Sequence, residues 1–140
     1  MVRKIIPDVI CDLKPVQLAG SATVHEAAKS MRKRNVGCVL IVEESRLEGI
    51  LTGRDVVQRV VAAGRDPDKT RLATVMTKNP DTIRPGATAM DALHLMQDGG
   101  YRHVPIVEDG QLLGVVSRRD FLGAEQARLD EETALWEHIR

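Results

Sequence analysis

The chain has 140 residues, 43% of them hydrophobic, and its twenty Lys and Arg balance twenty Asp and Glu. This composition is sufficient for one compact body with a buried core, and the absence of net charge argues against a nucleic-acid partner. No apolar run approaches the roughly 20 residues that a membrane-spanning helix needs, and the first residues are too short and too polar for a signal sequence. We therefore expect a cytoplasmic protein with no nucleic-acid or membrane partner.

The cysteines and histidines form no motif. Cys11 and Cys38 stand apart without a CxxC spacing, which is typical of reduced thiols in a reducing compartment, so we expect no disulfide. The histidines are scattered and include no His-x-x-x-His pair, which argues against a metal site: His25, His94, His103 and His138. Nucleophile-elbow, P-loop and dinucleotide glycine motifs are absent, so we do not expect an enzyme.

The first helix is predicted to begin at Thr23. Glu26 follows three residues later, so hydroxyl and carboxylate can each satisfy an orphan backbone N–H. Apolar residues then recur at the three-and-four spacing of one helix face: Val24, Ala27, Ala28 and Met31. Gly37 closes this region.

Two strands and a second helix are predicted to follow. The β-branched run 39–42 and the segment 47–52 are separated by a polar turn, as in a hairpin with a longer loop. The second helix begins near Arg54 and continues through Val61. Turn-forming residues then indicate a linker over 63–70.

The same order of elements returns at a constant offset. Thr88 follows Thr23 by 65 residues and Asp120 follows Asp55 by the same number, with no gap needed between these points. Such self-similarity indicates two copies of one supersecondary unit. In the second copy, strands are predicted over 104–107 and 112–117, and a second helix near Arg119 that continues through Leu122. The lead-in segments 10–18 and 75–83 also match each other.

The residues after the second copy predict one more helix. Apolar side chains alternate with charges there, as in an amphipathic helix that docks on its own body or on a second subunit: Ala124, Ala127, Leu129, Leu135, Trp136 and Ile139.

These motifs resemble the tandem cystathionine-β-synthase (CBS) domains known as a Bateman module. One ending occurs in both copies, at Gly49–Asp55 and Gly114–Asp120: glycine, two hydrophobic residues, threonine or serine, any two residues, and aspartate. The segment Val75-Met-Thr and the run Arg102–Val107 add to the resemblance. It implies an α/β (α+β) fold in which two β-α-β-β-α repeats pack with pseudo-twofold symmetry, plus a C-terminal helix. The expected boundaries are 5–70 for the first repeat with its linker, 71–125 for the second repeat and 126–140 for the amphipathic helix.

The resemblance also implies a function. Members of the CBS family bind adenosine-containing ligands between the repeats. The resemblance therefore implies AMP, ADP or ATP as the ligand, and less often S-adenosylmethionine or NAD. No required cofactor is expected. The expected protein is a non-catalytic sensor that signals occupancy to an unknown regulated protein and forms a homodimer.

Individual residues can be matched to parts of such a ligand. Asp55 and Asp120 can each accept both hydroxyls of a ribose diol. Thr52 and Ser117 lie where a strand gives way to the positive end of a helix, a position that suits phosphate. Basic side chains are further phosphate candidates: Arg102, His103, Arg54 and Arg119. Candidates for contact with the base are Thr82, Ile83, Val104 and Pro105, the last because proline withholds a ladder N–H.

Other interpretations use the same residues. Thr-x-x-Asp and Ser-x-x-Asp are also the pattern of a capping box, and arginines that precede aspartates form ordinary surface ion pairs. The first copy has Gly37 and Cys38 where the second has Arg102 and His103, so the two sites should differ in affinity. The alternative function is a ligand-free dimerising adaptor, and a third is a thiol or metal sensor built on Cys38 and His103.

Overall fold

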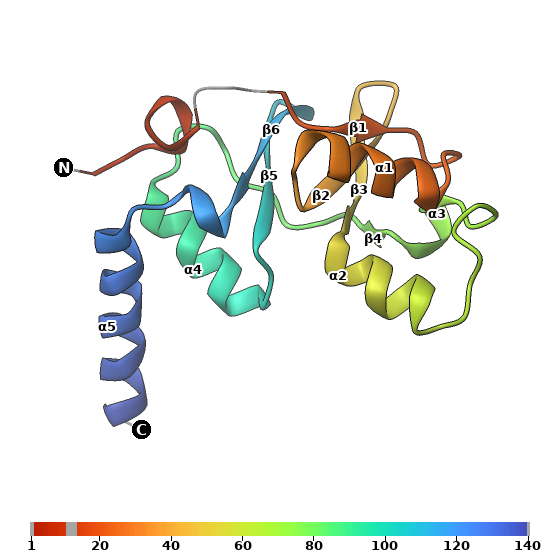
Figure 1. Cartoon of the computed structure of the whole chain (residues 1–140). Helices are drawn as coiled ribbons and strands as arrows, with labels where there is room; N and C mark the ends of the chain where they lie inside the picture. The colour runs from red at the N-terminus through yellow and green to blue at the C-terminus, as the bar shows by residue number, and fades with distance from the viewer. Residues whose placement is uncertain (1, 11–13, 140) are drawn as a thin grey trace. The chain divides into compact units, whose positions relative to one another are not determined.

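The computed structural model describes residues 2–10 and 14–139, and these form two compact units (Figure 1). The first-copy unit consists of Lys14–Asp81 together with Asp109–Leu113. The second-copy unit gathers the N-terminal segment, Thr82–Glu108 and the residues from Gly114 onward. The N-terminal segment thus belongs with the second copy rather than with the first, which follows it in the sequence.

The first-copy unit contains a small mixed sheet. Strand β1 (Gln17–Leu18) runs parallel to β2 (Cys38–Glu43), which forms an antiparallel hairpin with β3 (Arg46–Thr52). Strand β4 (Thr77–Lys78) pairs antiparallel with β3 on its other side. The predicted hairpin is confirmed, and its register places Cys38 opposite Thr52 at the end where β3 leaves the sheet.

Helices cover this sheet. Helix α1 (Val24–Arg34) begins at the predicted capping box of Thr23 and Glu26. It ends at Asn35, which takes the left-handed conformation with φ of 52°, two residues before the predicted stop at Gly37, because asparagine tolerates this conformation better than most residues. Helix α2 (Gly53–Asp55) continues into the helical segment η2 (Val56–Val61), and α3 (Leu72–Val75) follows the linker.

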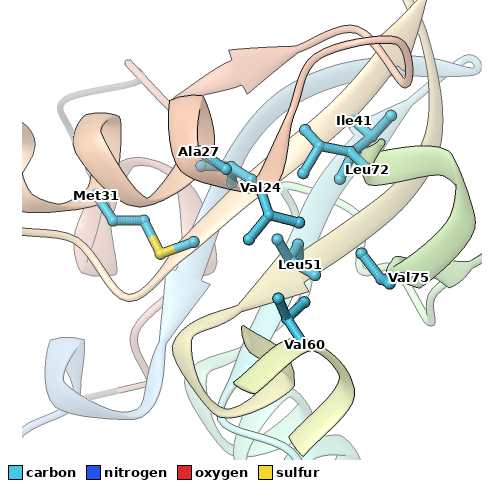
Figure 2. Packing of buried hydrophobic residues seen from close by; sticks show 9 residues of the cluster. Val24, Ala27, Met31, Ile41, Leu51, Val60, Leu72 and Val75 are labelled. Carbon is cyan, nitrogen blue, oxygen red and sulfur yellow. The ribbon is translucent and has the colours of Figure 1, made fainter. Parts of the chain in front are cut away.

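A single apolar cluster joins these elements (Figure 2). Side chains from α1, from strands β2 and β3, from η2 and from α3 are buried against one another: Val24, Ala27, Met31, Val39, Ile41, Leu51, Val60, Leu72 and Val75. The predicted apolar face of the first helix is therefore a core face, and its methionine fills core space. Burial of these side chains holds the end of β3 and the start of α2 in place.

The second-copy unit repeats the order with α4 (Ala89–Gly99), β5 (His103–Glu108) and β6 (Gln111–Ser117). Helix α4 begins at Thr88, the counterpart of Thr23, and Asp91 completes a capping box there as Glu26 does in α1. The N-terminal segment, with the helical turn η1 (Ile5–Val9), runs beside the start of α4: Ile5 N–H donates to the Ala87 carbonyl at 2.8 Å, and Ala89 N–H donates to the Arg3 carbonyl at 2.8 Å.

The second helix of the second copy differs from the prediction. After β6 comes a single turn, η3 (Arg118–Asp120), and Phe121 is extended, with its side chain buried. A new helix, α5 (Gly123–Ile139), then begins, with the Leu122 N–H donating to Glu125 Oε1 at 2.9 Å. The predicted continuous helix from Arg119 through Leu122 is wrong, because burial of Phe121 and this new cap end one helix and start another.

The C-terminal helix is present but starts before residue 126, and its apolar residues do not share a buried face. Leu129 is 2% exposed, whereas Leu135 and Trp136 are 61% and 67% exposed. The contacts with α4 are largely polar: His94 Nε2 lies 2.6 Å from Glu132 Oε2, and Gln97 Nε2 donates to Thr133 Oγ1 at 2.6 Å. The helix α5 therefore does not pack through a continuous apolar face as expected. It contacts α4 through the buried Leu129 and through polar side chains. The side chain of Ile139 lies outside the described residues.

Candidate functional site

The first aspartate turn lies where β3 passes into α2. The Thr52 N–H donates to Asp55 Oδ2 at 2.9 Å, and the Asp55 N–H donates to Thr52 Oγ1 at 3.2 Å. The Gly53 N–H donates to the Gly37 carbonyl at 3.0 Å, which fixes this turn against the start of β2. The structure therefore contains the capping box that the sequence pattern allowed, with the Asp55 side chain 17% exposed.

Arg59 adds a positive charge to this turn. Its Nε lies 3.8 Å from Asp55 Oδ1, and its Nη1 donates to the Val75 carbonyl at 2.9 Å. Arg59 is not among the site residues expected from the sequence. The signal was available, because an acidic and a basic residue four positions apart on a predicted helix lie on the same face.

The second aspartate turn has the same backbone arrangement. The Ser117 N–H donates to Asp120 Oδ2 at 2.7 Å, and the Ser117 hydroxyl donates to the same oxygen at 3.2 Å. The Arg118 N–H donates to the Arg102 carbonyl at 2.9 Å, the exact counterpart in position of the Gly53 bond to Gly37. This bond brings Arg102 beside the start of the turn that ends at Asp120.

The arginines near this second turn have different surroundings. Arg118 is held to α5, since its Nε donates to Gln126 Oε1 at 2.6 Å and Gln126 Nε2 donates back to the Arg118 carbonyl at 3.0 Å. Arg119 and Arg102 are exposed, as is Arg54 beside the first turn.

The candidates for base contact gather along one strand edge. The Ile83 N–H donates to the Pro105 carbonyl at 3.0 Å, and the Val107 N–H donates to the Ile83 carbonyl at 2.9 Å. Thr82 is exposed, whereas Ile83 and Val104 are 9% and 0% exposed. The position of Pro105 in the first copy is Leu40, whose N–H donates to the Val16 carbonyl; proline has no such donor.

The residues of the proposed thiol or metal sensor lie in different units. Cys38 is buried in β2, His103 is half-buried at the start of β5, and Cys11 lies outside the described residues. Among residues 2–10 and 14–139, no group of three or more His, Cys, Asp or Glu is arranged to hold a metal ion. The helices of this same part of the chain are too short or too polar to cross a membrane.

Comparison with protein families gives a CBS domain match twice, over residues 8–62 and 72–127. The chain is 37% identical over 115 residues to an uncharacterised protein of Methanopyrus kandleri, covering 79% of this chain and 59% of that protein. It is 35% identical over 107 residues to the mitochondrial CBS domain-containing protein CBSX3 of Arabidopsis thaliana, covering 73% of this chain and 52% of that one. It spans 20% of the length of another Arabidopsis relative, CBSCBSPB1, at 35% identity over 113 residues.

Solved structures with the same fold include a CBS domain protein of Pyrobaculum aerophilum in complex with AMP. The identity is 28%, the TM-score is 0.77, and the match covers 88% of this chain and 95% of that one. A hexameric CBS-CP12 protein from bloom-forming cyanobacteria matches with a TM-score of 0.77 at 27% identity, over 86% of this chain and 66% of that one.

Proposed function

Because the chain belongs to the CBS domain family and carries two CBS domains in tandem, we propose that it is a non-catalytic sensor that binds an adenine nucleotide and signals the occupancy to a partner protein. The observation that carries this proposal is the likeness to an AMP-bound CBS protein over 88% of this chain and 95% of that one. AMP, ADP and ATP are the proposed ligands, ahead of S-adenosylmethionine and NAD, and the proposed location is the cleft between the CBS repeats.

The aspartate turns supply the proposed ribose contacts. A carboxylate can accept both hydroxyls of a ribose diol, and Asp55 and Asp120 each already hold a rigid position through a backbone N–H bond to Oδ2. A capping role is compatible with ligand binding, because a carboxylate oxygen has more than one lone pair. The cap orients the carboxylate before the ligand arrives.

Phosphate and base contacts are proposed from the neighbouring residues. We propose that the hydroxyls of Thr52 and Ser117 donate to phosphate. Positive charge would come from His103 and from three arginines near the turns: Arg54, Arg102 and Arg119. For the base we propose Thr82 together with backbone groups of Ile83, Val104 and Pro105, since the side chains of Ile83 and Val104 are almost fully buried.

Signalling would follow from differential affinity. A nucleotide that binds one arrangement of the repeats more tightly than another shifts the population toward that arrangement, by no more than the difference in its binding free energies. The regulated partner is a protein that recognises one of the two arrangements.

The test is thermal unfolding of the full chain with AMP, ADP, ATP, NAD and S-adenosylmethionine at millimolar concentration. A ligand selective for the folded state raises the midpoint by mass action, and we expect this for at least one adenine nucleotide. Asp120→Ala should remove the rise. Asp91→Ala is the matched control, because it removes an equivalent capping carboxylate from α4 at a similar cost of about 1 kcal/mol and should keep the rise.

The alternative is a ligand-free adaptor whose repeats serve dimerisation and docking. It predicts no shift in midpoint with any of the five compounds, and equal small losses of stability in the two aspartate variants. That outcome would replace the sensor proposal.

A homodimer and a cytoplasmic location complete the proposal. Val57 and Val61 leave an apolar strip on the second helix of the first copy, 59% and 68% exposed, which supports contact with a second chain. The cytoplasm is proposed from the two isolated cysteines. Since one relative is named as mitochondrial, imaging of a fluorescent fusion in the source cell is the decisive observation.

A further inference from the structure

We propose that only the Asp120 turn binds a nucleotide in the unmodified protein, and that Arg59 keeps the Asp55 turn in a low-affinity state. This inference rests on the nucleotide binding proposed above and specifies which of the two positions is used. It makes Arg59 a residue that sets the number of ligands per chain.

Recognition of a ribose diol by a carboxylate works best when each oxygen accepts one hydroxyl. In the first copy, Asp55 Oδ2 already accepts the Thr52 N–H, and Oδ1 faces Arg59 Nε at 3.8 Å. A ribose that approaches Asp55 therefore meets a carboxylate whose second oxygen is compensated by a cation. To bind in the two-hydroxyl mode, it has to share Oδ1 with the guanidinium or displace it.

The Arg59 side chain is 46% exposed, but its guanidinium has a second partner besides Asp55. Its Nη1 donates to the carbonyl of Val75, the last residue of α3, at 2.9 Å, and Val75 itself belongs to the buried cluster. A charged donor bonded to a backbone carbonyl is stronger than a neutral one. The guanidinium is thus anchored to the core of its own unit at a point where it also faces Asp55, so removing it from the carboxylate breaks more than one weak ion pair.

The second copy has no arginine at the position equivalent to Arg59. The position four residues after Asp120 is Ala124, and the helix that carries Arg59 in the first copy is interrupted at Phe121 in the second. The second copy also presents Arg102 and His103 where the first has Gly37 and Cys38. Arg102 precedes β5, and its carbonyl accepts the Arg118 N–H at the start of the Asp120 turn. In the first copy, by contrast, the guanidinium of Arg59 faces the aspartate itself, with its Nε 3.8 Å from Oδ1.

Calorimetric titration of the full chain with AMP measures the number of sites. We expect one AMP per chain for the natural protein, none for Asp120→Ala, and two for Arg59→Gln. The double variant Asp120→Ala/Arg59→Gln should regain one site, which then belongs to the Asp55 turn. Arg65→Gln is the control for loss of a positive charge from the same unit, since Arg65 bonds Thr74 rather than Asp55.

Two sites of similar affinity in the natural protein would overturn this inference while leaving the proposed function standing. Retention of one AMP site by Asp120→Ala would also overturn this inference. That result does not depend on how well Arg59→Gln folds. Weaker binding in Arg59→Gln would identify Arg59 as a phosphate contact instead, also against the inference. Absence of AMP binding in every variant and in the natural protein would reject the nucleotide proposal itself.

Discussion

At the scale of single residues, the ion pair between Arg3 and Glu125 joins two parts of the chain that are 122 positions apart. Arg3 Nη2 lies 2.7 Å from Glu125 Oε1, and Nε donates to Oε2 at 3.2 Å, with side chains 17% and 15% exposed. Glu125 occupies the position that in the first copy is Val60, which is fully buried. An apolar contact in one copy is therefore replaced by a two-point ion pair in the other.

This pair predicts a pH dependence of stability. The hydrogen bond from Arg3 is the main reason why the pKa of Glu125 lies below its ordinary value. A carboxyl whose pKa is lower in the folded state contributes stability at pH values above its unfolded pKa, and that contribution is lost as the pH falls through the folded pKa. Glu125→Gln should therefore lower the free energy of unfolding by about 1–2 kcal/mol at pH 7.

Urea unfolding at a series of pH values measures this effect. The difference between Glu125→Gln and the natural protein should shrink toward zero as the pH drops below the ordinary carboxyl range. The exposed Glu131 on the same helix provides the control, since Glu131→Gln should change stability little at any pH. A difference that persists undiminished in acid would mean that the ion pair is not the cause.

At the scale of elements, α4 and α5 meet through one apolar anchor and several polar contacts. Leu129 is 2% exposed, and the groove between the two helices has a volume of about 510 Å³. The groove is bordered by acidic side chains and by Trp136. The packing of α5 on its own unit therefore depends heavily on Leu129.

Truncation of this anchor should be costly. Leu129→Ala should reduce the free energy of unfolding by about 2–5 kcal/mol, because a buried leucine loses both its transfer free energy and its packing partners. Leu135→Ala on the same helix removes the same atoms from a side chain that is 61% exposed, and should change stability by less than about 0.5 kcal/mol. Denaturant unfolding of the two variants compares them directly; equal losses would contradict the single-anchor description.

Some of these elements could be predicted from local sequence patterns and others could not. Capping boxes at Thr23 and Thr88, the strands and the apolar face of α1 are predictable because their signals lie within a few residues of one another. The break in the helix at Phe121 was not predictable, because burial of the Phe121 side chain overrides the helical pattern that the comparison with the first copy suggests. Neither was the partner of Glu125, since no periodicity links it to a residue near the other end of the chain.

The candidate site follows the same division. The repeated endings marked both aspartate turns, and the structure finds each of them capped as the pattern allowed. The bonds that bring Gly37 and Arg102 to these turns come from tertiary pairing between segments, which the repeat offset alone does not specify. Arg59 was within reach of a local argument, but its anchor on Val75 was not.

At the scale of the whole molecule, duplication gives two units with different surfaces. The second helix of the first copy leaves Val57 and Val61 exposed, and the equivalent of Val57 in the second copy, Leu122, is 53% exposed. Scattered apolar residues are ordinary on a surface, but Val57 and Val61 lie on one helical segment and form a strip, which supports the proposed contact with a second chain.

The homodimer proposal is tested by size-exclusion chromatography with light scattering. The natural protein should elute with twice the mass of one chain, and the Val57→Asp/Val61→Asp variant with the mass of one, because two buried carboxylates without partners oppose association. Glu44→Lys, at the exposed turn between β2 and β3, is the charge-changing control and should stay dimeric. A monomer for the natural protein would remove the proposal, and a larger assembly would revise its stoichiometry.

The attachment of the N-terminal segment to the second copy has a consequence for biosynthesis. The ribosome adds about 5–20 residues per second, so Arg3 emerges on the order of 10 s before Glu125 is made. During that interval the first-copy unit can assemble, while Ile5, fully buried in the finished protein, has no core to join until α4 has been made. The nascent chain thus carries this apolar segment without its partners until α4 is translated, and this is the stage at which a chaperone would find it.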